Sequence, residues 1–296
     1  MGFSSYDDLI SELTAGKRNK RVWQNTFPNV TGVAGRWYST WTWTGSGPGA
    51  TYTAAGSLSS QAFFATTLGA LFAGNNVSPD TKHLLSVSAM SPAATAVPGI
   101  AILVDRLLTY PGIVCTPSAT QSTATPVTLP RYTTGAGVVA WFEAANVLGT
   151  AQGGLAGVQV VYTNSDGVAT RTTLGTTSAI YSASQASSIA NTATSSQFFR
   201  NPFLPYASTD TGIQSVQEVK FTGGTMTSGV MQLVLGYPLC SVPIPAVNVL
   251  SERDLVFQLA NLARVYDGAC LNWLIFAPGA IVANTSYTGE LDVGWG

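Results

Sequence analysis

The stretch GIAILVDRLLTY, residues 99–110, indicates the fold class of this chain most directly. Its apolar residues follow one another without a helical spacing, and such a short continuous run is typical of a strand buried on both faces. Pro98 interrupts the apolar residues on one side, and Asp105 and Arg106 end them on the other, so the run is too short to span a bilayer. We therefore predict a buried strand here and no membrane contact.

Further strand patterns lie on both sides of this stretch and are separated by turn residues. HLLSVSA at 83–89 alternates in part, and GVVAWFEAANVLG at 137–149 and ACLNWLIFAPG at 269–279 are predicted strands. GVQVVYTNSDGVATRTTLG at 157–175 predicts a hairpin that turns at NSDG. IQSVQEVKFTGGTMTSGVMQLVLGYPL at 213–239 predicts a second hairpin, closed at or just after Gly223-Gly224. Residues 176–200, rich in Ser, Thr, Ala and Asn, are expected to form a surface loop.

Two segments carry helix signals. YDDLISELT at 6–14 follows Ser5, which can cap a helix, begins with two aspartates that suit the helix dipole, and is followed by Gly16, which can end it. SERDLVFQLANLA at 251–263 begins with an approximate capping box, and its leucines fall on one face. We predict one short helix near the N-terminus and one in the C-terminal region.

Many short strands, turn signals and only two helices predict a mainly β fold. The expected architecture is an antiparallel β-sandwich of the jelly-roll kind. We divide the chain into a helical and basic docking arm at 1–22, an aromatic-rich β region at 23–115, a Thr/Ser/Pro-rich loop or boundary at 116–130, and a β region at 131–296 that contains the helix 251–263.

The composition limits the classes of function. Only 9% of the 296 residues are charged, against about 25% in an average globular protein, and the formal net charge is −1. A chain so near neutrality lacks the electrostatic footprint of a nucleic-acid binder, and 46% apolar residues exclude intrinsic disorder. Because the chain has almost no net charge, electrostatic repulsion between copies is weak, which favours association with other protein molecules.

The N-terminal arm is the first candidate interface. Its helix has one narrow apolar stripe, and KRNKR at 17–21 follows directly. The basic run is either a solvated linker or part of a mobile arm that docks on an acidic partner. A short helix of this kind is marginal alone, so we expect residues 1–22 to fold against a neighbouring subunit and their deletion to leave the β body folded. The candidate interface residues in this arm are Phe3, Leu9, Ile10, Leu13, Lys17, Arg18, Lys20 and Arg21.

Tryptophans form the second candidate interface. Trp37, Trp41 and Trp43 share parity, so in one unbroken strand their rings would point to the same face, and Trp23 lies shortly before them. Such a face is either part of the core or a platform for stacking, sugar binding or subunit contact. We keep both interpretations and include these four tryptophans among the candidate interface residues.

Signals of catalysis, metal binding or cofactor binding are weak. His83 is the single histidine, and no nucleophile elbow, Walker lysine or paired-cysteine metal spacing occurs. The acidic residues, Asp105 and Glu143 among them, stand mostly alone, and nothing selects a catalytic pair. The three widely separated cysteines predict buried free thiols. We expect no enzyme activity, no catalytic residues, no metal and no cofactor.

Several segments resemble virion structural proteins of tailed bacteriophages. They are FSSYDDLISELTAGK at 3–17, GRWY at 35–38, VSPDTKHLLSVSAMSPAATAVPGIAILVDRLLTYPGI at 77–113, LPRYTTGAGVVAWFEA at 129–144, VYTNSDGVATRTT at 161–173, DTGIQSVQEVKFT at 210–222 and ERDLVFQLANLARVYDGACLNWLIF at 252–276. The resemblance implies a particle component made in the host cytoplasm. It supplies no catalytic residues.

The residues narrow the choice of particle component. A major shell protein would be expected to show a long helix and a charged loop, a portal or terminase a nucleotide site or basic channel, and a fibre sequence repeats. The chain shows none of these, which favours a capsid decoration (cement) protein on the virion surface. Its expected partners are the phage major capsid protein and copies of itself, as a homo-oligomer and by assumption a trimer, with no specific nucleic acid and no membrane. The alternatives are a tail, adaptor or vertex component, a shell-forming jelly roll, and a carbohydrate- or receptor-binding β module.

Overall fold

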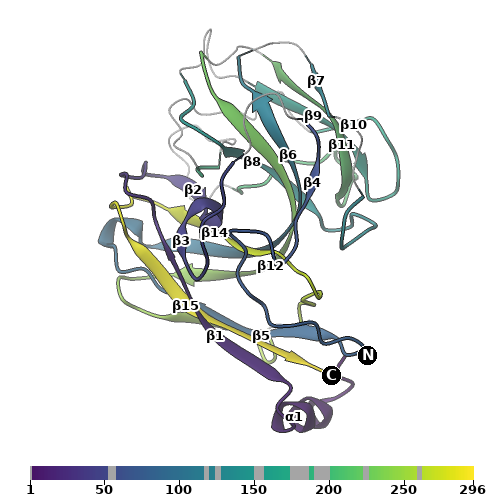
Figure 1. Cartoon of the computed structure of the whole chain (residues 1–296), viewed down its shortest axis with the longest axis vertical. Coiled ribbons are helices and arrows are strands. Elements are labelled where there is room, and N and C mark those ends of the chain that lie inside the picture. The colour runs from purple at the N-terminus through teal and green to yellow at the C-terminus, as the bar shows by residue number, and fades with distance from the viewer. Residues whose placement is uncertain are drawn as a thin grey trace.

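The computed structural model describes residues 2–52, 58–116, 120–123, 128–149, 157–173, 187–189, 201–222, 227–258 and 262–296. Most elements in these ranges are strands (Figure 1). In chain order they are α1 (Tyr6–Thr14), β1 (Arg18–Thr26), β2 (Arg36–Ser39), the 3-10 helix η1 (Thr40–Thr42), β3 (Thr44–Gly45), β4 (Gln61–Ala62), β5 (Lys82–Ala89), the 3-10 helix η2 (Ala94–Ala96), β6 (Gly99–Val114), β7 (Gln121–Ser122), β8 (Val139–Ala144), β9 (Gly157–Asn164), β10 (Arg171–Thr172), β11 (Ile213–Thr222), β12 (Val230–Ile244), β13 (Ser251–Asp254), β14 (Leu271–Ala277) and β15 (Ser286–Trp295).

The strands form three antiparallel sheets. The five-stranded sheet has the order β13-β5-β15-β1-β3, the six-stranded sheet runs β2-β14-β6-β12-β8 with β4 beside β6, and the four-stranded sheet runs β10-β9-β11-β7. The predicted fold class, a mainly antiparallel β-sandwich with a short N-terminal helix, is confirmed. The five- and six-stranded sheets combine strands from before and after residues 116–130, whereas the four-stranded sheet takes β7 from within that range and its other strands from after it, so the predicted regions 23–115 and 131–296 share two of the sheets.

Two long strands join the sheets into one body. β6 has 16 residues and β12 has 15, and they pair along most of their length. One half of the six-stranded sheet packs on the five-stranded sheet and the other half packs on the four-stranded sheet, at the bottom and top of Figure 1 respectively. The apolar stretch at residues 99–110 is therefore shared by two sandwiches.

The two sandwiches have different cores. Towards the five-stranded sheet, Ala101 and Leu103 of β6 pack among large aromatic rings, including those of Trp23, Trp43 and Trp273. Towards the four-stranded sheet, Leu107, Leu108, Tyr110 and Ile113 of β6 pack mainly among aliphatic side chains. The register between β6 and β12 shifts between these two groups, at Leu235/Gly236. Such an irregularity changes which side chains face a given sheet, and here it lets one strand serve both cores.

The N-terminal helix forms as its sequence predicts. The Ser5 side chain accepts the N–H of Asp8 at 3.1 Å, and the chain leaves the helix through Gly16 at φ +85°. The stretch after it differs from the expected linker, because Arg18–Thr26 is strand β1 and pairs with β15 over nine residues. Residues 18–22 are therefore part of the five-stranded sheet, and deletion of residues 1–22 would remove the first half of β1 instead of leaving the body intact.

The predicted helix at 251–263 is wrong. Ser251–Asp254 is strand β13, which pairs with β5 from Ser251↔Ala89 to Asp254↔Ser86, and turns follow at Leu255–Phe257. The Asp254 carboxylate accepts hydrogen bonds from the N–H groups of Val256 and Phe257. The residue expected to cap a helix therefore stabilises a turn instead. Pairing with β5 satisfies the backbone N–H and C=O groups that hydrogen bonds within a helix would otherwise satisfy. The local helix propensity is too weak to outweigh this pairing. Residues 259–261 lie outside the described ranges.

Two further expectations are corrected. β11 and β12 do not pair as a hairpin, because β11 pairs with β9 and β7 while β12 pairs with β6 and β8, so the two strands enter different sheets. Of the expected surface loop at 176–200, the described residues 187–189 are buried and bridge to Tyr38 and Glu143, and the others lie outside the described ranges. The predicted strands at 83–89, 99–110, 137–149 and 269–279 and the hairpin β9–β10 are confirmed.

Candidate functional site

Three of the predicted interface residues pack α1 onto its own chain. Leu9 is buried, and Leu13 lies so close to Gly294 of β15 that a Cβ added there would come within 3.0 Å of it. The ring of Phe3 lies against His83 of β5, with 5.7 Å between ring centroids. The helix therefore covers one end of the five-stranded sheet of the same chain, where both termini also lie (Figure 1).

Along the edge of the same apolar stripe, α1 exposes two residues that form an apolar patch with Phe257 of the turn after β13; we call it the helix patch and define it as Tyr6, Ile10 and Phe257. Tyr6 and Phe257 stack at 5.7 Å with an angle of 11° between rings, although they are 59% and 78% exposed. Ile10, one turn along the helix from Tyr6, is 61% exposed. Large apolar side chains gathered in this way on a folded surface are typical of a contact with another molecule. Ile10 is the predicted interface residue that the structure leaves free for such a contact.

The basic residues at the start of β1 pair mostly within the chain. Lys17 Nζ lies 2.9 Å from both Glu12 and Asp80 carboxylate oxygens. Arg18 Nε donates to both carboxylate oxygens of Asp292, at 3.0 and 3.1 Å. These pairs hold the helix end and the two terminal strands together.

The next two basic residues differ in their partners. Lys20 pairs with Glu290 at 2.8 Å across β1 and β15. Arg21 instead lies 4.4 Å above the ring of Phe72 and donates to Asn19 Oδ1 at 3.2 Å. Among the described residues, no carboxylate pairs with Arg21, so its charge is available to a partner.

The four tryptophans of the predicted interface lie inside the molecule. Trp23, Trp37, Trp41 and Trp43 are 3%, 6%, 2% and 1% exposed. The 3-10 turn Thr40–Thr42 breaks the alternation that would place three of the rings on one face. Trp37 and Trp41 enter two separate clusters of the core, and Trp23 and Trp43 share a third. The folded chain therefore does not present these rings to a partner, and of the two interpretations the structure favours the core.

A buried ion pair lies where β6 passes from one sandwich to the other. Arg106 Nη1 and Nη2 donate to Glu143 Oε1 and Oε2 at 2.6 and 3.1 Å, and neither side chain is exposed. Glu143 also accepts from Trp141 Nε1 at 2.8 Å and from the Tyr52 hydroxyl at 3.2 Å. The Arg106 guanidinium lies 4.1 Å from the ring of Trp41. Glu143 is thus saturated with donors and has no room for a substrate.

A second buried pair stands directly beside the first. Arg131 Nε and Nη2 donate to Asp105 Oδ2 and Oδ1 at 2.8 and 2.7 Å, and the Cys270 N–H donates to Oδ1 at 2.9 Å. Arg131 also donates to the backbone oxygens of Phe63 and Arg106. Burial raises the pKa of Asp105, and the hydrogen bonds from Arg131 oppose that rise. We call these two pairs the ionic junction, defined as Asp105, Arg106, Arg131 and Glu143.

The ionic junction was missed by the sequence analysis, which treated its acidic residues as single. A signal for it exists, because Asp105 and Arg106 interrupt an apolar strand and Glu143 interrupts another. Charges inside such strands need partners, since burying an unpaired ion is costly. The partners themselves lie 26 and 37 residues apart in the chain and could not be assigned from spacing.

The remaining titratable candidates are structural. Burial raises the pKa of the Cys115, Cys240 and Cys270 thiols to about 12. All three thiols are free, and Cys115 and Cys270 are buried as predicted, whereas Cys240 is partly exposed. Such thiols stay protonated and unreactive at neutral pH. His83 is half-buried beside Phe3 and the Leu262 backbone oxygen, and burial lowers its pKa.

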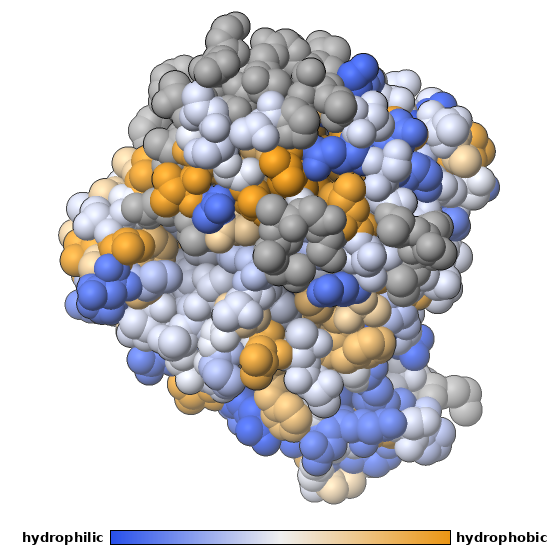
Figure 2. Space-filling model, turned by 45° about the horizontal axis from the view of Figure 1, so that its top comes forward, coloured by the Kyte–Doolittle hydropathy of each residue, from blue (hydrophilic) through white to orange (hydrophobic). Residues whose placement is uncertain are grey.

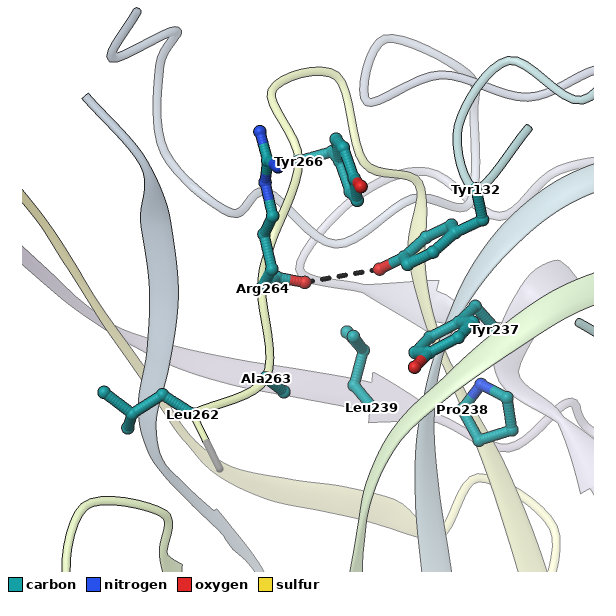
Figure 3. Close-up of a pocket in the computed structure, with 8 residues that line it drawn as sticks. All are labelled: Tyr132, Tyr237, Pro238, Leu239, Leu262, Ala263, Arg264 and Tyr266. Atoms are coloured by element: carbon teal, nitrogen blue, oxygen red, sulfur yellow. Dashed lines mark hydrogen bonds between the residues drawn. The ribbon is translucent and has the colours of Figure 1, made fainter. Parts of the chain in front are cut away.

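A small cavity of about 270 Å³ lies between β12 and the segment 262–266 (Figure 3). The rings of Tyr132 and Tyr237 stack at 4.0 Å, and Tyr266 meets Tyr132 edge-on at 4.8 Å. The Tyr132 hydroxyl donates to the Arg264 backbone oxygen at 3.3 Å, and the guanidinium of that arginine lies 4.2 Å from the Tyr266 ring. Pockets for small ligands commonly hold about 300–1,000 Å³. The tyrosines mainly pack on one another and join the segment to the sheet.

The described ranges also offer neither a metal site nor a membrane-spanning helix. Within them, three or more His, Cys, Asp or Glu side chains do not gather closely enough to hold a metal ion. The helices described there are all too short or too polar to cross a membrane. Much of the face drawn in Figure 2 is pale, the colour of residues of intermediate hydropathy, with separate orange and blue groups between.

Comparison with known proteins finds no matching family model and no matching curated protein. Among solved structures, the VP2 subviral particle of infectious bursal disease virus is 10% identical, with 94% of this chain and 81% of that chain covered and a TM-score of 0.21. The unassembled VP1 pentamer of KI polyomavirus is 12% identical, with 95% of this chain and 94% of that chain covered and a TM-score of 0.19. These neighbours are viral capsid proteins.

Proposed function

We propose that this chain is a structural component of a virus particle, and specifically a decoration protein that binds the major capsid protein shell of a tailed bacteriophage. The helix patch carries the proposal, because it exposes two stacked aromatic rings and an isoleucine at one end of a rigid β body. The resemblance of seven sequence segments to virion proteins supports the same conclusion. The proposed role is mechanical and non-catalytic.

A decoration protein stabilises a shell by adding contacts between its subunits. Any molecule that binds only the assembled shell shifts the equilibrium towards assembly. Apolar contacts such as those of the helix patch keep their strength at high salt, whereas exposed ion pairs are screened. The scarcity of charged residues in this chain, 9%, agrees with contacts of the apolar kind.

The test adds purified protein to expanded phage shells that lack it. We expect the protein to bind and to raise the temperature at which the shells rupture. A triple variant Tyr6→Ser/Ile10→Ser/Phe257→Ser should fold normally, because the three side chains are exposed, and should bind at least tenfold more weakly.

A matched control removes exposed apolar side chains elsewhere. Val30 and Val282 are 47% and 58% exposed and lie outside the helix patch, so Val30→Ser/Val282→Ser should bind like the unchanged protein. Failure of the unchanged protein to bind any shell would refute the decoration role. Equal binding by the triple variant would remove the helix patch from the proposal.

The alternatives differ in copy number and ligand. A decoration or shell-forming protein is present in hundreds of copies per particle and a tail, adaptor or vertex protein in far fewer, so quantitative mass spectrometry of particles separates them. A carbohydrate-binding module built on the tryptophans finds no support, because all four rings are buried. Self-association, as a trimer or another oligomer, is part of the proposal and is tested by the mass of the protein in solution.

A further inference from the structure

Among the described strands, none lies beside the outer edge of β1 along most of its length. β15 pairs with all nine residues of β1 on one side, whereas β3 on the other side pairs only with Asn25 and Thr26. Within the described ranges, no strand lies beside Arg18–Trp23 on that side. Lys20, Arg21 and Val22 are exposed, and Val22 is 71% exposed.

The direction of the backbone groups on this edge follows from Gln24. Its N–H donates to Ser46 Oγ at 2.6 Å and its oxygen accepts the Ser46 N–H at 2.7 Å, so the backbone groups of Gln24 point away from β15. In an antiparallel strand, alternate residues direct their N–H and C=O to the same edge. Lys20 and Val22 therefore present their N–H and C=O groups outward, ready to pair with an added strand.

A hollow of about 410 Å³ lies against the same part of β1. Arg18, Asn19 and Arg21 line it from the strand, and Phe72, residues 74–77 and Trp295 line it from the other sides. Recognition by strand addition combines main-chain hydrogen bonds along an edge with a recess that accepts a side chain of the added strand. Both parts occur here on one strand.

The charges indicate what kind of segment fits. Lys17, Arg18 and Lys20 already pair with carboxylates, whereas the contacts of Arg21 with described residues are with the Phe72 ring and the Asn19 amide oxygen. A side chain of an added strand opposite Arg21 would lie on the same face of the sheet, towards the hollow. An aspartate or glutamate in that position would pair with the free guanidinium. A second copy of β1 is a poor partner, because its own basic residues would then lie opposite those of the first.

We infer that the outer edge of β1 at Arg18–Trp23 accepts an extended, acidic segment from a neighbouring subunit of the particle as an additional strand. This inference rests on the proposed function and names a contact beyond the helix patch. The added strand would pair with Lys20 and Val22 and place a carboxylate beside Arg21.

Amide hydrogen exchange on free protein and on assembled particles tests the inference. We expect exchange at Lys20 and Val22 to slow at least tenfold on assembly. Arg21 and Trp23 direct their amides towards β15 and serve as internal controls whose exchange should hardly change. Free-protein exchange rates at Lys20 and Val22 in a particle that contains the chain would overturn this inference and leave the proposed function standing. Absence of the chain from particles would overturn both.

Two substitutions provide an independent readout. Val22→Pro removes the outward N–H without touching the bonds to β15, a position where edge strands accept proline. It should reduce incorporation into particles at least tenfold, whereas the control Val30→Ser/Val282→Ser, which leaves this edge untouched, should incorporate normally. Arg21→Glu should also weaken incorporation, and its effect should shrink at high salt. Normal incorporation of folded Val22→Pro would mean that this edge stays unpaired and that Lys20 merely guards it against aggregation.

Discussion

The ionic junction and the basic stretch of β1 both place paired charges on β-strands, but in opposite surroundings. At the junction, Arg106 and Glu143 are completely buried. On β1, the side chains of Lys20 and Glu290 are 49% and 38% exposed at a similar distance. A buried pair is costly to break, since removing one partner leaves an uncompensated ion, whereas an exposed pair exchanges its partner for water. The comparison teaches that the same residue types hold the fold together in one region and remain available for contacts in the other.

The largest expected effect comes from Arg106→Met. It leaves the Glu143 carboxylate buried without its cation, and the free energy of unfolding should fall by about 3–5 kcal/mol. Urea unfolding followed by tryptophan fluorescence measures it. The double variant Arg106→Met/Glu143→Leu should recover much of the loss, because it leaves no unpaired charge. A single variant within about 1 kcal/mol of the unchanged protein would contradict the assigned difference between the two regions.

The substitution Arg131→Lys tests whether the positive charge alone, or also the geometry of the guanidinium, stabilises the ionic junction. It keeps the positive charge but loses the fork that donates at 2.8 and 2.7 Å to Asp105 and also reaches the Phe63 and Arg106 backbone oxygens. We expect a loss of about 1–3 kcal/mol by the same urea assay, because buried acceptors lose their donors. No loss would show that charge alone suffices there.

The ion pair of Asp210 and Arg171 is intermediate between the buried ionic junction and the exposed pairs of β1, and it predicts a pH dependence of stability. Its carboxylate is buried, while its partner Arg171 is 32% exposed. Hydrogen bonds from Arg171, Tyr162 and Asn164 lower the pKa of Asp210 to about 2 from its ordinary 3.8. A pKa lowered by folding contributes stability above its unfolded value, and this contribution disappears as the pH falls from about 4 to about 2.

The melting temperature should therefore decrease across this pH interval more steeply in the unchanged protein than in Asp210→Asn. Thermal unfolding at a series of pH values measures the two slopes. Equal slopes would mean that Asp210 does not contribute to acid sensitivity.

The smallest effect is expected for Lys20→Ala. It removes the exposed pair with Glu290, whose members exchange each other for water at little cost. The midpoint of urea unfolding should shift by no more than the repeat error, at low and at high salt. A shift of the urea midpoint as large as that of Arg131→Lys would mean that exposed and buried ion pairs contribute equally to the stability of this protein.

Several elements could be predicted because their causes lie within a few residues. Ser5 and Gly16 bound α1 through local hydrogen bonds and backbone conformation, and the continuous apolar residues of 99–110 required a buried strand. The helix predicted at 251–263 was wrong, because residues 251–254 pair with β5 as an edge strand and no local sequence pattern reveals that pairing. The shared parity of Trp37, Trp41 and Trp43 does not place their rings on one face, because the 3-10 turn Thr40–Thr42 interrupts the strand.

By itself, the sequence determined the β class, the N-terminal helix, the low surface charge and the free thiols, since side-chain periodicity, capping and composition act locally or on the whole chain. Which strands share a sheet, which carboxylate neutralises which arginine and which edge stays open depend on the folded arrangement of the chain. Those outcomes depend on segments that are distant in the chain, such as Arg106 and Glu143 at a separation of 37 residues. The partner of a backbone group or a buried charge is set by folding of the whole chain, so no single segment encodes it.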